Sequence, residues 1–523
     1  MKKKSEYLSL LAGTAALAPA FNGAAAQEAK HYNVIIIESD DHAYQMISAY
    51  GGLMKTPGID RIADGGVRFD QSFVANSISG PSRANTITGK HSHKNGYLQN
   101  VDGHFNGDQQ TFPKLLHAAG YQTAVVGKWH LESLPQGFDY WEIFPGQGDY
   151  YNSNTIIAPN DTISNVGYAS ELVADKSLAW LKEKRDPDRP FFLWIEHKSV
   201  HRDWLPRVKD LERFEDQEFP VPETFFDDYK GRPAAEHAEM RIGRDMDIAY
   251  DVKVEQENPE TILAHYYTEL VNRLSPEGQK RYRAFYDKII KEYNSKKRSE
   301  KEEALWKYQR YMRDYAKVVY AMDESIGRVM DYLEEEGLLD NTLVIYTSDQ
   351  GFYMGEHGWF DKRFMYEESF RTPLVMHLPK GLDARGAIGE LVQNIDLAPT
   401  VLDAAGVPIP ADMQGRSLLP LLRGQKQLPG RDALYYHFYE YPAEHMAMRH
   451  YGVRTDRYKL IHFYNKDDFW ELYDLKKDPN ELHNVIDDPA YLGVRKAMEK
   501  TLLEEQIRYD DQVAIGLNNF EKE

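Results

Sequence analysis

The sequence predicts an α/β fold with a large, mainly parallel sheet, followed by a smaller α+β region with an antiparallel sheet. Two observations support the parallel sheet: short buried runs alternate with helical stretches, and polar clusters directly follow three of these runs. Beyond about residue 425 the runs become aromatic and closely spaced, which favours antiparallel strands. A chain of 523 residues is long enough for a large core and more than one domain.

The chain begins with a segment typical of a secretory signal. Three lysines follow Met1, an apolar stretch covers residues 8–20, and residues 24–26 offer a small-residue cleavage site. We therefore expect residues 1–26 to be a signal peptide and the mature protein to be periplasmic or secreted. No cysteine lies near the cleavage site, and no other stretch is apolar enough to cross a bilayer, so we expect no membrane anchor.

The strands predicted for the first region are short apolar runs bounded by polar residues. They cover residues 33–39, 122–126, 191–196 and 342–347, and a helix is predicted over residues 112–120. Ligands of such sheets collect beyond the carboxyl ends of the strands. The polar clusters at these ends are therefore expected to share one site; they are Asp40-Asp41, Lys128 with His130, and Asp349-Gln350.

Residues 207–300 are charged and rich in tyrosine, which predicts an insertion with surface helices. Residues 305–333 predict a long amphipathic helix, because apolar side chains recur every seven residues. A strand follows soon afterwards, which favours a helix packed on the sheet over a coiled coil. We place the first domain at 27–425 and the second at 426–523, where strands at 433–439, 451–454 and 458–463 precede a helix at about 490–509.

Composition excludes several classes of function. The chain has no cysteine, so it has neither disulfides nor thiolate metal ligands nor a cysteine nucleophile. The net charge of −19 argues against nucleic-acid binding, which needs a basic face. It also gives no long-range attraction for an anionic substrate. Such a substrate would need a local cluster of cations inside a pocket.

Carboxylates at two strand ends suggest a metal site. Asp40 and Asp41 follow the first strand, and Asp349 with Gln350 follows another. Three carboxylates and an amide oxygen suit a hard divalent cation, with Ca²⁺ and Mg²⁺ both possible. Acidic pairs in loops are usually only solvated, so each pair alone is a weak indication.

Residues 79–89 read Ser-x-Pro-Ser-Arg, four residues, then Thr-Gly. This pattern resembles the motif of type I sulfatases, in which a cysteine or serine is oxidised to formylglycine. The resemblance implies an alkaline-phosphatase-like sandwich fold and a modified Ser79 (3-oxoalanine). For a serine it also implies a formylglycine-generating maturase of the anaerobic type as a partner. A proline-containing turn that opens a helix is the alternative for this motif alone.

The same resemblance implies a set of metal ligands. They are Asp40, Asp41, Ser79, Asp349 and Gln350. The family commonly has an asparagine where this chain has Gln350, which keeps the amide oxygen but adds a methylene group. Calcium, with its loose oxygen geometry, tolerates that change better than octahedral magnesium.

The catalytic roles are also implied by the resemblance. Arg83 would hold the formylglycine, while Lys128, within a Gly-Lys-x-His motif at 127–130, and Lys362 would contact sulfate oxygens. A cage of cations of this kind stabilises charge that develops in the transition state. His201, favoured over His197 by its spacing, would protonate the departing oxygen together with Lys362. His130 would then take a proton from the remaining hydroxyl as sulfate leaves.

Further segments resemble one subgroup of sulfatases. They are residues 92–96, 355–368 and 449–454. The subgroup is that of bacterial N-acetylglucosamine-6-O-sulfatases, which act on the non-reducing end of heparan sulfate or mucin-type glycans. The resemblance implies that Asp361 and Arg363 bind sugar hydroxyls, with help from His445 or His450. A plain surface ion pair is the alternative for Asp361 and Arg363.

Three other functions stay open at this point. A sulfatase could act on 6-sulfated N-acetylgalactosamine or galactose instead. A phosphatase or phosphonate hydrolase of the same superfamily would use similar metal chemistry, although it would need more histidine and aspartate ligands than these strand ends offer. A chain with an unmodified Ser79 could only bind a sulfated glycan.

Overall fold

The computed structural model describes residues 31–255, 261–442, 444–464 and 468–520. His31–Glu523 form one compact unit, and the predicted signal peptide lies outside the described residues. In the described ranges, no helix is long and apolar enough to cross a membrane. Both predicted sheets belong to this compact unit, so the boundary near residue 425 stays a prediction.

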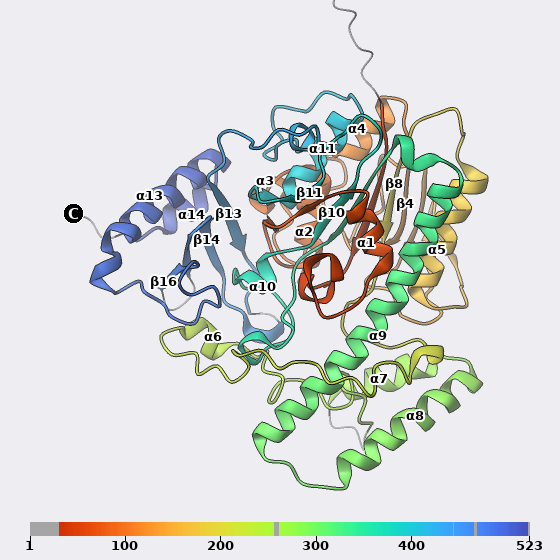
Figure 1. Cartoon of the computed structure of the whole chain (residues 1–523), viewed down its shortest axis with the longest axis vertical. Helices are drawn as coiled ribbons and strands as arrows, with labels where there is room; N and C mark the ends of the chain where they lie inside the picture. Colours follow the sequence, from red (N-terminus) through yellow and green to blue (C-terminus); the bar gives the residue numbers. More distant parts are fainter. Residues whose placement is uncertain (1–30, 256–260, 443, 465–467, 521–523) are drawn as a thin grey trace, which may run out of the picture. The chain divides into compact units, whose positions relative to one another are not determined.

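A mixed sheet, ten-stranded in the described part of the chain, forms the centre of the molecule (Figure 1). Its spatial order is β11 (Gly386–Ile388), β2 (Gly66–Phe69), β10 (Leu374–His377), β9 (Thr342–Ser348), β1 (Asn33–Ser39), β8 (Phe191–Glu196), β4 (Gln122–Lys128), β5 (Tyr140–Phe144), β6 (Thr155–Ile157) and β7 (Asp161–Ile163). The central strands β9, β1, β8, β4 and β5 are parallel, while β10, β6 and β7 pair antiparallel with their neighbours. The large, mainly parallel sheet is therefore confirmed.

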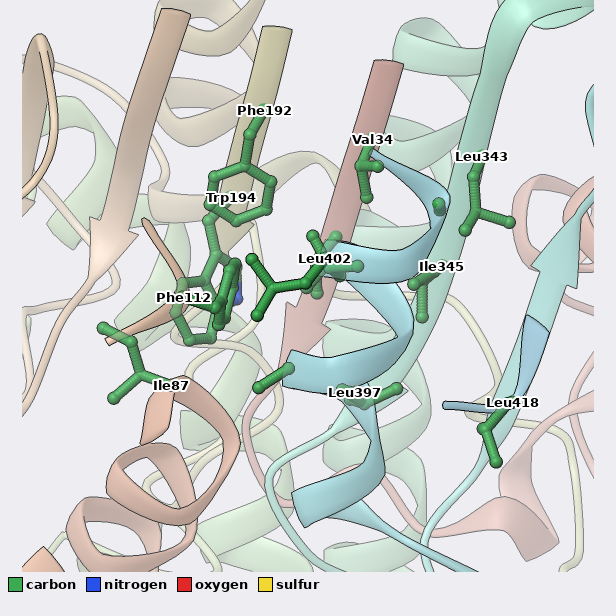
Figure 2. Close-up of a cluster of buried hydrophobic side chains, with 14 of the residues drawn as sticks. Val34, Ile87, Phe112, Phe192, Trp194, Leu343, Ile345, Leu397, Leu402 and Leu418 are labelled. Carbon is green, nitrogen blue, oxygen red and sulfur yellow. The ribbon is translucent and has the colours of Figure 1, made fainter. Parts of the chain in front are cut away.

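Helices cover both faces of this sheet. One face carries α2 (Ser79–Thr88), α4 (Phe112–Ala118) and α11 (Leu397–Ala404), and the other carries α1 (Pro57–Asp64), α5 (Ala169–Ala179) and α9 (Glu300–Glu335). Figure 2 shows Phe112 and Leu402 packed beside Trp194 on the first face. Successive residues of β1 point to opposite faces, and both faces are buried. Double burial explains why the strand sequence is continuously apolar.

The long helix α9 joins two cores. Its C-terminal half, with Met322 and Ile326, packs against the sheet, as the sequence predicts. Its N-terminal half packs against the insertion helices α7 (Ile262–Asn272) and α8 (Pro276–Asn294), as Figure 1 shows. The helix begins five residues before the predicted start at Leu305, because Ser299 and Glu302 form a capping box. The insertion tyrosines are core residues here; Tyr267, Tyr282 and Tyr286 are buried.

A second sheet, four-stranded among the described residues, follows in the C-terminal part. Its antiparallel strands are β13 (Ala433–Phe438), β14 (His450–Thr455), β15 (Tyr458–Phe463) and β16 (Phe469–Asp474), and α13 (Leu492–Tyr509) and α14 (Gln512–Leu517) pack on one face. The other face packs against residues that follow β9, including Phe364 and Tyr366. Shorter elements complete the fold: β3 (Ser72–Phe73), β12 (Val392–Gln393), α3 (Ser92–Asn95), α6 (Pro233–His237), α10 (Glu367–Phe370) and α12 (Leu419–Leu422).

Candidate active site

Four neighbouring parallel strands end at the same edge of the central sheet. Their order is β9, β1, β8, β4. The residues at these ends are Asp349 and Gln350 after β9, Asp40 and Asp41 after β1, His201 shortly after β8, and Lys128 with His130 at the end of β4. The strand order therefore brings together the polar clusters that the sequence placed at strand ends.

Ser79 is the first residue of α2 and lies against this edge. Its Oγ donates a hydrogen bond to Oδ1 of Asp40 at 3.2 Å and accepts one from Nε2 of Gln350 at 3.3 Å. The next residue is closely packed: a Cβ on Gly80 would lie 2.6 Å from Cε1 of Tyr97 and 2.7 Å from Oδ1 of Asn100, so a larger residue would require these side chains to shift. The motif thus fixes both the reactive position and the close packing beside it.

Two lysines pair with the carboxylates next to Ser79. Lys128 forms a buried ion pair with Asp40, and Nζ of Lys362 lies 2.7 Å from Oδ2 of Asp41. Burial lowers the pKa of Lys128 to about 8, although Asp40 opposes the shift. Burial also acts to lower the pKa of Lys362, but Asp41 and Asp361 outweigh it and raise that pKa. Both ammonium groups are thus placed to bind an anion beside Ser79.

Arg83 lies one turn along α2 and is almost completely buried. Its Nη1 forms an ion pair with Glu196 and donates to the carbonyl of Lys128 at 3.1 Å, while Nη2 lies 3.2 Å from Oδ2 of Asp349. Arg83 therefore braces three strand ends beneath the site. Sequence reasoning missed Glu196; the available signal was a glutamate that ends a buried strand.

Two histidines flank the carboxylates. His201 lies with Nε2 3.8 Å from Oδ2 of Asp41, because Nδ1 donates to the carbonyl of Arg202 at 2.5 Å. His130 is buried, and its Nδ1 has no hydrogen-bond partner among the described residues. Burial and the neighbouring Lys128 hold the pKa of His130 well below its usual range, so its neutral ring can accept a proton. His201 lines the cavity described below, and His197 does not.

The donor set fits a hard divalent cation. Oε1 of Gln350 is buried and has no hydrogen-bond partner in the described structure. Burial and the charge of Asp40 raise the pKa of Asp349 well above its usual range. Ligand atoms of Asp40, Asp41 and His201 all lie within 4.8 Å of one another. Buried carboxylates and an amide oxygen without a donor are stabilised by a cation that prefers oxygen ligands.

A cavity of about 210 Å³ opens above Ser79. Its lining includes Ser79, Asn100, Gln147, Gly148, Lys198, His201, Arg202, Asp203, Tyr250, Leu263, Tyr266, Leu270, Asp361, Lys362, Arg363 and Glu444. These residues come from α2, the segments after α3, β5, β8 and β9, the insertion and the C-terminal part. Ligand pockets for drug-sized molecules typically span about 300–1,000 Å³, so this cavity suits a single sugar ring.

Asp361 and Arg363 form a buried ion pair in the wall of this cavity, not a pair on the surface. Nε2 of His445 lies 3.1 Å from the second carboxylate oxygen of Asp361, and thus orients it. Glu444, with a side chain 56% exposed, bridges Arg363 at 3.2 Å and Arg202 at 2.8 Å. The C-terminal part therefore supports the wall through two consecutive residues.

The structure does not bring His450 to the cavity, which corrects its prediction as a sugar-binding residue. His450 is completely buried between Phe364 and Phe463. Its Nδ1 donates to the carbonyl of Met448 at 2.7 Å, and its Nε2 accepts from the amide of Met365 at 3.1 Å. Both ring nitrogens are satisfied, so His450 serves the packing of β14.

Five of the candidate residues have left-handed backbone conformations. They are Asp41 (φ 61°), His130 (φ 49°), Asp361 (φ 77°), Arg363 (φ 95°) and His445 (φ 65°). Such conformations are uncommon for residues other than glycine, and they cluster at functional sites where side chains must point in a set direction. In this chain they occur in separate loops that contribute side chains to the candidate site.

The family model described as Sulfatase matches residues 32–407 of this chain. The chain belongs to this family. A second family, described as the C-terminal part of N-sulphoglucosamine sulphohydrolase, matches residues 355–508. Both matches agree with the two sheets of the structure and with the resemblance of residues 79–89 to the sulfatase motif.

Individual relatives narrow the comparison. The sulfatase is 47% identical to an N-acetylglucosamine-6-O-sulfatase from Bacteroides thetaiotaomicron, over 93% of this chain and 88% of the relative. It is 25% identical to the N-acetylglucosamine-6-sulfatase of Homo sapiens, over 88% of this chain and 82% of the relative. A solved structure described as a complex with its substrate D-glucosamine-2-N,6-O-disulfate matches with a TM-score of 0.88 and 46% identity, over 92% of this chain and 99% of that one. The predicted resemblance to this subgroup is confirmed.

Proposed function

We propose that this sulfatase hydrolyses the 6-O-sulfate of a terminal N-acetylglucosamine in heparan sulfate or mucin-type glycans. The observation that carries the proposal is the shared cavity: Ser79 and Lys362 lie in the same small space as the buried pair Asp361 and Arg363. One end therefore offers sulfate chemistry and the other offers charged groups for sugar hydroxyls. The relatives named above act on, or bind, sulfated glucosamine.

Ser79 would act as formylglycine after oxidation by an anaerobic-type maturase. The hydrated aldehyde would supply two hydroxyls, one to attack sulfur and one to expel sulfate later. Lys128 and Lys362 would hold the sulfate oxygens, and Arg83 would hold the formylglycine in place. His201, once protonated at Nε2, and the ammonium of Lys362 would supply the proton to the departing sugar oxygen. His130, whose neutral ring is favoured by burial, would accept a proton as sulfate leaves.

Asp40, Asp41, Asp349 and Gln350 would hold Ca²⁺, with Mg²⁺ as the alternative. The cation would supply positive charge beside Ser79 and the sulfate. We expect added Ca²⁺ to raise the free energy of unfolding by about 2.7 kcal/mol at a hundredfold excess over its Kd. Thermal unfolding after chelation and re-addition measures this change, with Asp349→Asn as the variant that should lose it. A wild-type protein that ignores Ca²⁺ and Mg²⁺ alike would contradict the metal assignment.

The signal-like segment at 1–26 supports export, and we propose a periplasmic or secreted location. Fractionation of the native host with an antibody to residues 27–523 checks it, because the processed chain should leave the cytoplasm. A full-length chain retained in the cytoplasm would contradict this location.

The experiment that tests the function compares sulfate released from 6-sulfated N-acetylglucosamine and from 6-sulfated N-acetylgalactosamine. We expect the glucosamine substrate to be preferred. Aryl sulfate and aryl phosphate, assayed in parallel, separate a sulfatase from a phosphatase. The mass of the tryptic peptide that contains Ser79 should be lower by about two hydrogens after oxidation of the alcohol. A converted protein that releases no sulfate from the glucosamine substrate would overturn the proposal.

A further inference from the structure

Lys198 lines the cavity, yet it has no ionic partner. The residue follows β8, is 5% exposed, and its ammonium lies 5.0 Å from the centre of the Tyr150 ring. Within the ranges that the structure describes, no carboxylate lies within 4.0 Å of this ammonium. The lysines at the base of the cavity differ, because Lys128 and Lys362 each pair with an aspartate. A buried cation that faces a cavity without a partner points to a ligand.

Asp203, five residues further along the same segment, shows the complementary feature. It is 3% exposed, lines the same cavity, and its Oδ2 is buried without a hydrogen-bond partner in the described structure. Lys253 contacts the backbone carbonyl of Asp203 and not its carboxylate. The neighbouring Arg202 is fully engaged by Asp251 and Glu444. Among the cavity-lining residues of this segment, Lys198 therefore offers a donor and Asp203 an acceptor that no side chain of the described structure pairs.

A ligand that satisfies both groups must offer a donor to Asp203 and an acceptor to Lys198. The two side chains do not form an ion pair within 4.0 Å, so a substituent with its donor and its acceptor on separate atoms suits the space between them. An amide offers an N–H and a carbonyl oxygen, and a sulfamate offers an N–H and anionic oxygens. Sugar hydroxyls can also donate to Asp203 and accept from Lys198, but an amide or a sulfamate serves both side chains with one substituent, and a sulfamate adds negative charge for Lys198.

We propose that Lys198 and Asp203 form the subsite for the nitrogen substituent at C2 of glucosamine. This inference rests on the proposed function and names the part of the substrate that distinguishes an amino sugar. Asp203 accepts the N–H of the substituent, and Lys198 binds its carbonyl or sulfonate oxygens. The insertion supplies an apolar side of the same cavity through Leu263 and Tyr266, which accommodates the methyl of an acetyl group.

The two residues divide the recognition between them. Asp203 accepts the N–H of the substituent; a C2 hydroxyl can donate to Asp203 too, but it then offers Lys198 no separate acyl or sulfonate oxygen. Lys198 reads the charge of the substituent, because a hydrogen bond between ionised groups is about twice as strong as a neutral one. Loss of each side chain is therefore expected to change a different substrate ratio.

The experiment measures kcat/KM for three 6-sulfated sugars: N-acetylglucosamine, N-sulfoglucosamine and glucose. Asp203→Ala should lower the ratio of N-acetylglucosamine to glucose by about tenfold or more, because a site built for a polar group discriminates strongly. Asp203→Asn, which keeps an acceptor oxygen, should retain most of that ratio. Lys198→Met should lower the ratio of the N-sulfo to the N-acetyl substrate by about tenfold. Ratios within one variant do not depend on the folded fraction.

Lys209→Met and Asp161→Asn are matched controls, because both positions are exposed and neither lines the cavity. Ratios that stay within about threefold of wild type in both Asp203→Ala and Lys198→Met would overturn the subsite while the proposed function stands. A wild-type protein that releases sulfate from none of the three sugars would overturn the proposed function, and this subsite with it.

Discussion

The two ends of the cavity are built in different ways. The sulfate end consists of Ser79 and Lys362 in the cavity lining, with Asp40, Asp41 and Lys128 in contact behind them. The sugar end consists of Lys198, Asp203, Asp361, Arg363 and Glu444. The first is almost entirely supported by one edge of a parallel sheet, whereas the second combines loops, the insertion and the C-terminal part.

Burial differs only at the rim of the sugar end. Lys198, Asp203, Asp361 and Arg363 are buried like Asp40 and Lys128, whereas Glu444 has a half-exposed side chain and Tyr266 is 43% exposed. A rigid, dry end suits electrostatic stabilisation of a transition state. An end made from separate segments can change its ligand by changing one segment, and leave the chemistry intact. Reaction type and substrate choice are thus carried by separable parts of this chain.

The largest effect is expected from Ser79→Ala. Removing the side chain that becomes the nucleophile should lower kcat for aryl sulfate and for 6-sulfated N-acetylglucosamine by at least about 10⁴-fold. The midpoint of thermal unfolding should stay close to that of wild type, since only one hydroxyl is lost. Substantial turnover of either substrate by this variant would show that another group attacks sulfur.

Lys128→Met is expected to lower kcat by about 10²–10³-fold, because one cation of a preorganised cage is lost. The loss should be equal for aryl sulfate and for the sugar, since Lys128 belongs to the sulfate end. Steady-state kinetics with both substrates measure it, and circular dichroism checks that the fold is retained. A loss confined to the sugar would break the distinction between the two ends.

Most of the sulfate end could be predicted from sequence, because its residues lie next to a strand or in the motif at 79–89; Lys362, in the loop between β9 and β10, followed only from the family resemblance. Parallel strands converge at one edge by geometry, so neighbours in space could be inferred without contacts. The start of α9 was missed only because its capping box was not recognised. Glu196 was missed because its partner Arg83 is far away in sequence.

The sugar end could be predicted only in part. Asp361, Arg363 and His445 followed from resemblance, but the choice between His445, in the turn before β14, and His450, in β14 itself, depended on their tertiary contacts. Contacts such as those of Glu444 with Arg202 join segments more than two hundred residues apart. No local pattern encodes such pairs, because they arise when the C-terminal sheet packs against the loop after β9.

Arg363→Met should act on the sugar alone. A hydrogen bond from a charged group contributes about 1.5–3 kcal/mol, which corresponds to roughly 10–150-fold in kcat/KM for 6-sulfated N-acetylglucosamine. Turnover of an aryl sulfate, which lacks sugar hydroxyls, should stay within about threefold of wild type. Arg449→Met is a suitable control, since Arg449 bonds only backbone carbonyls of Tyr439 and Tyr441 in the described structure. Equal losses with both substrates would place Arg363 at the sulfate end.

The smallest effect on sulfate release is expected from Glu471→Gln, within the C-terminal sheet that supports the sugar end. Burial raises the pKa of Glu471 to about 7, although its carboxylate accepts hydrogen bonds from Tyr366 at 2.7 Å and Tyr473 at 2.8 Å. The folded state therefore holds a proton that the unfolded state, with a pKa near its model-peptide value of about 4.3, has released. The stabilisation from this group is fully present below the unfolded-state pKa of about 4.3 and is lost as the pH rises through about 7.

Glutamine cannot ionise, so the free energy of unfolding of Glu471→Gln should not fall with pH on account of this position. If the difference between variant and wild type at pH 5 is taken as zero, the variant should be more stable by about 1–3 kcal/mol at pH 8. Denaturant unfolding across this range measures the difference, and Glu335→Gln, at the exposed end of α9, is the control. Both substrates should be turned over at wild-type rates, because Glu471 does not line the cavity. A rate change with the sugar alone would mean that the packing around Tyr366 transmits the charge to the sugar end, and the separation of the two ends would then be incomplete.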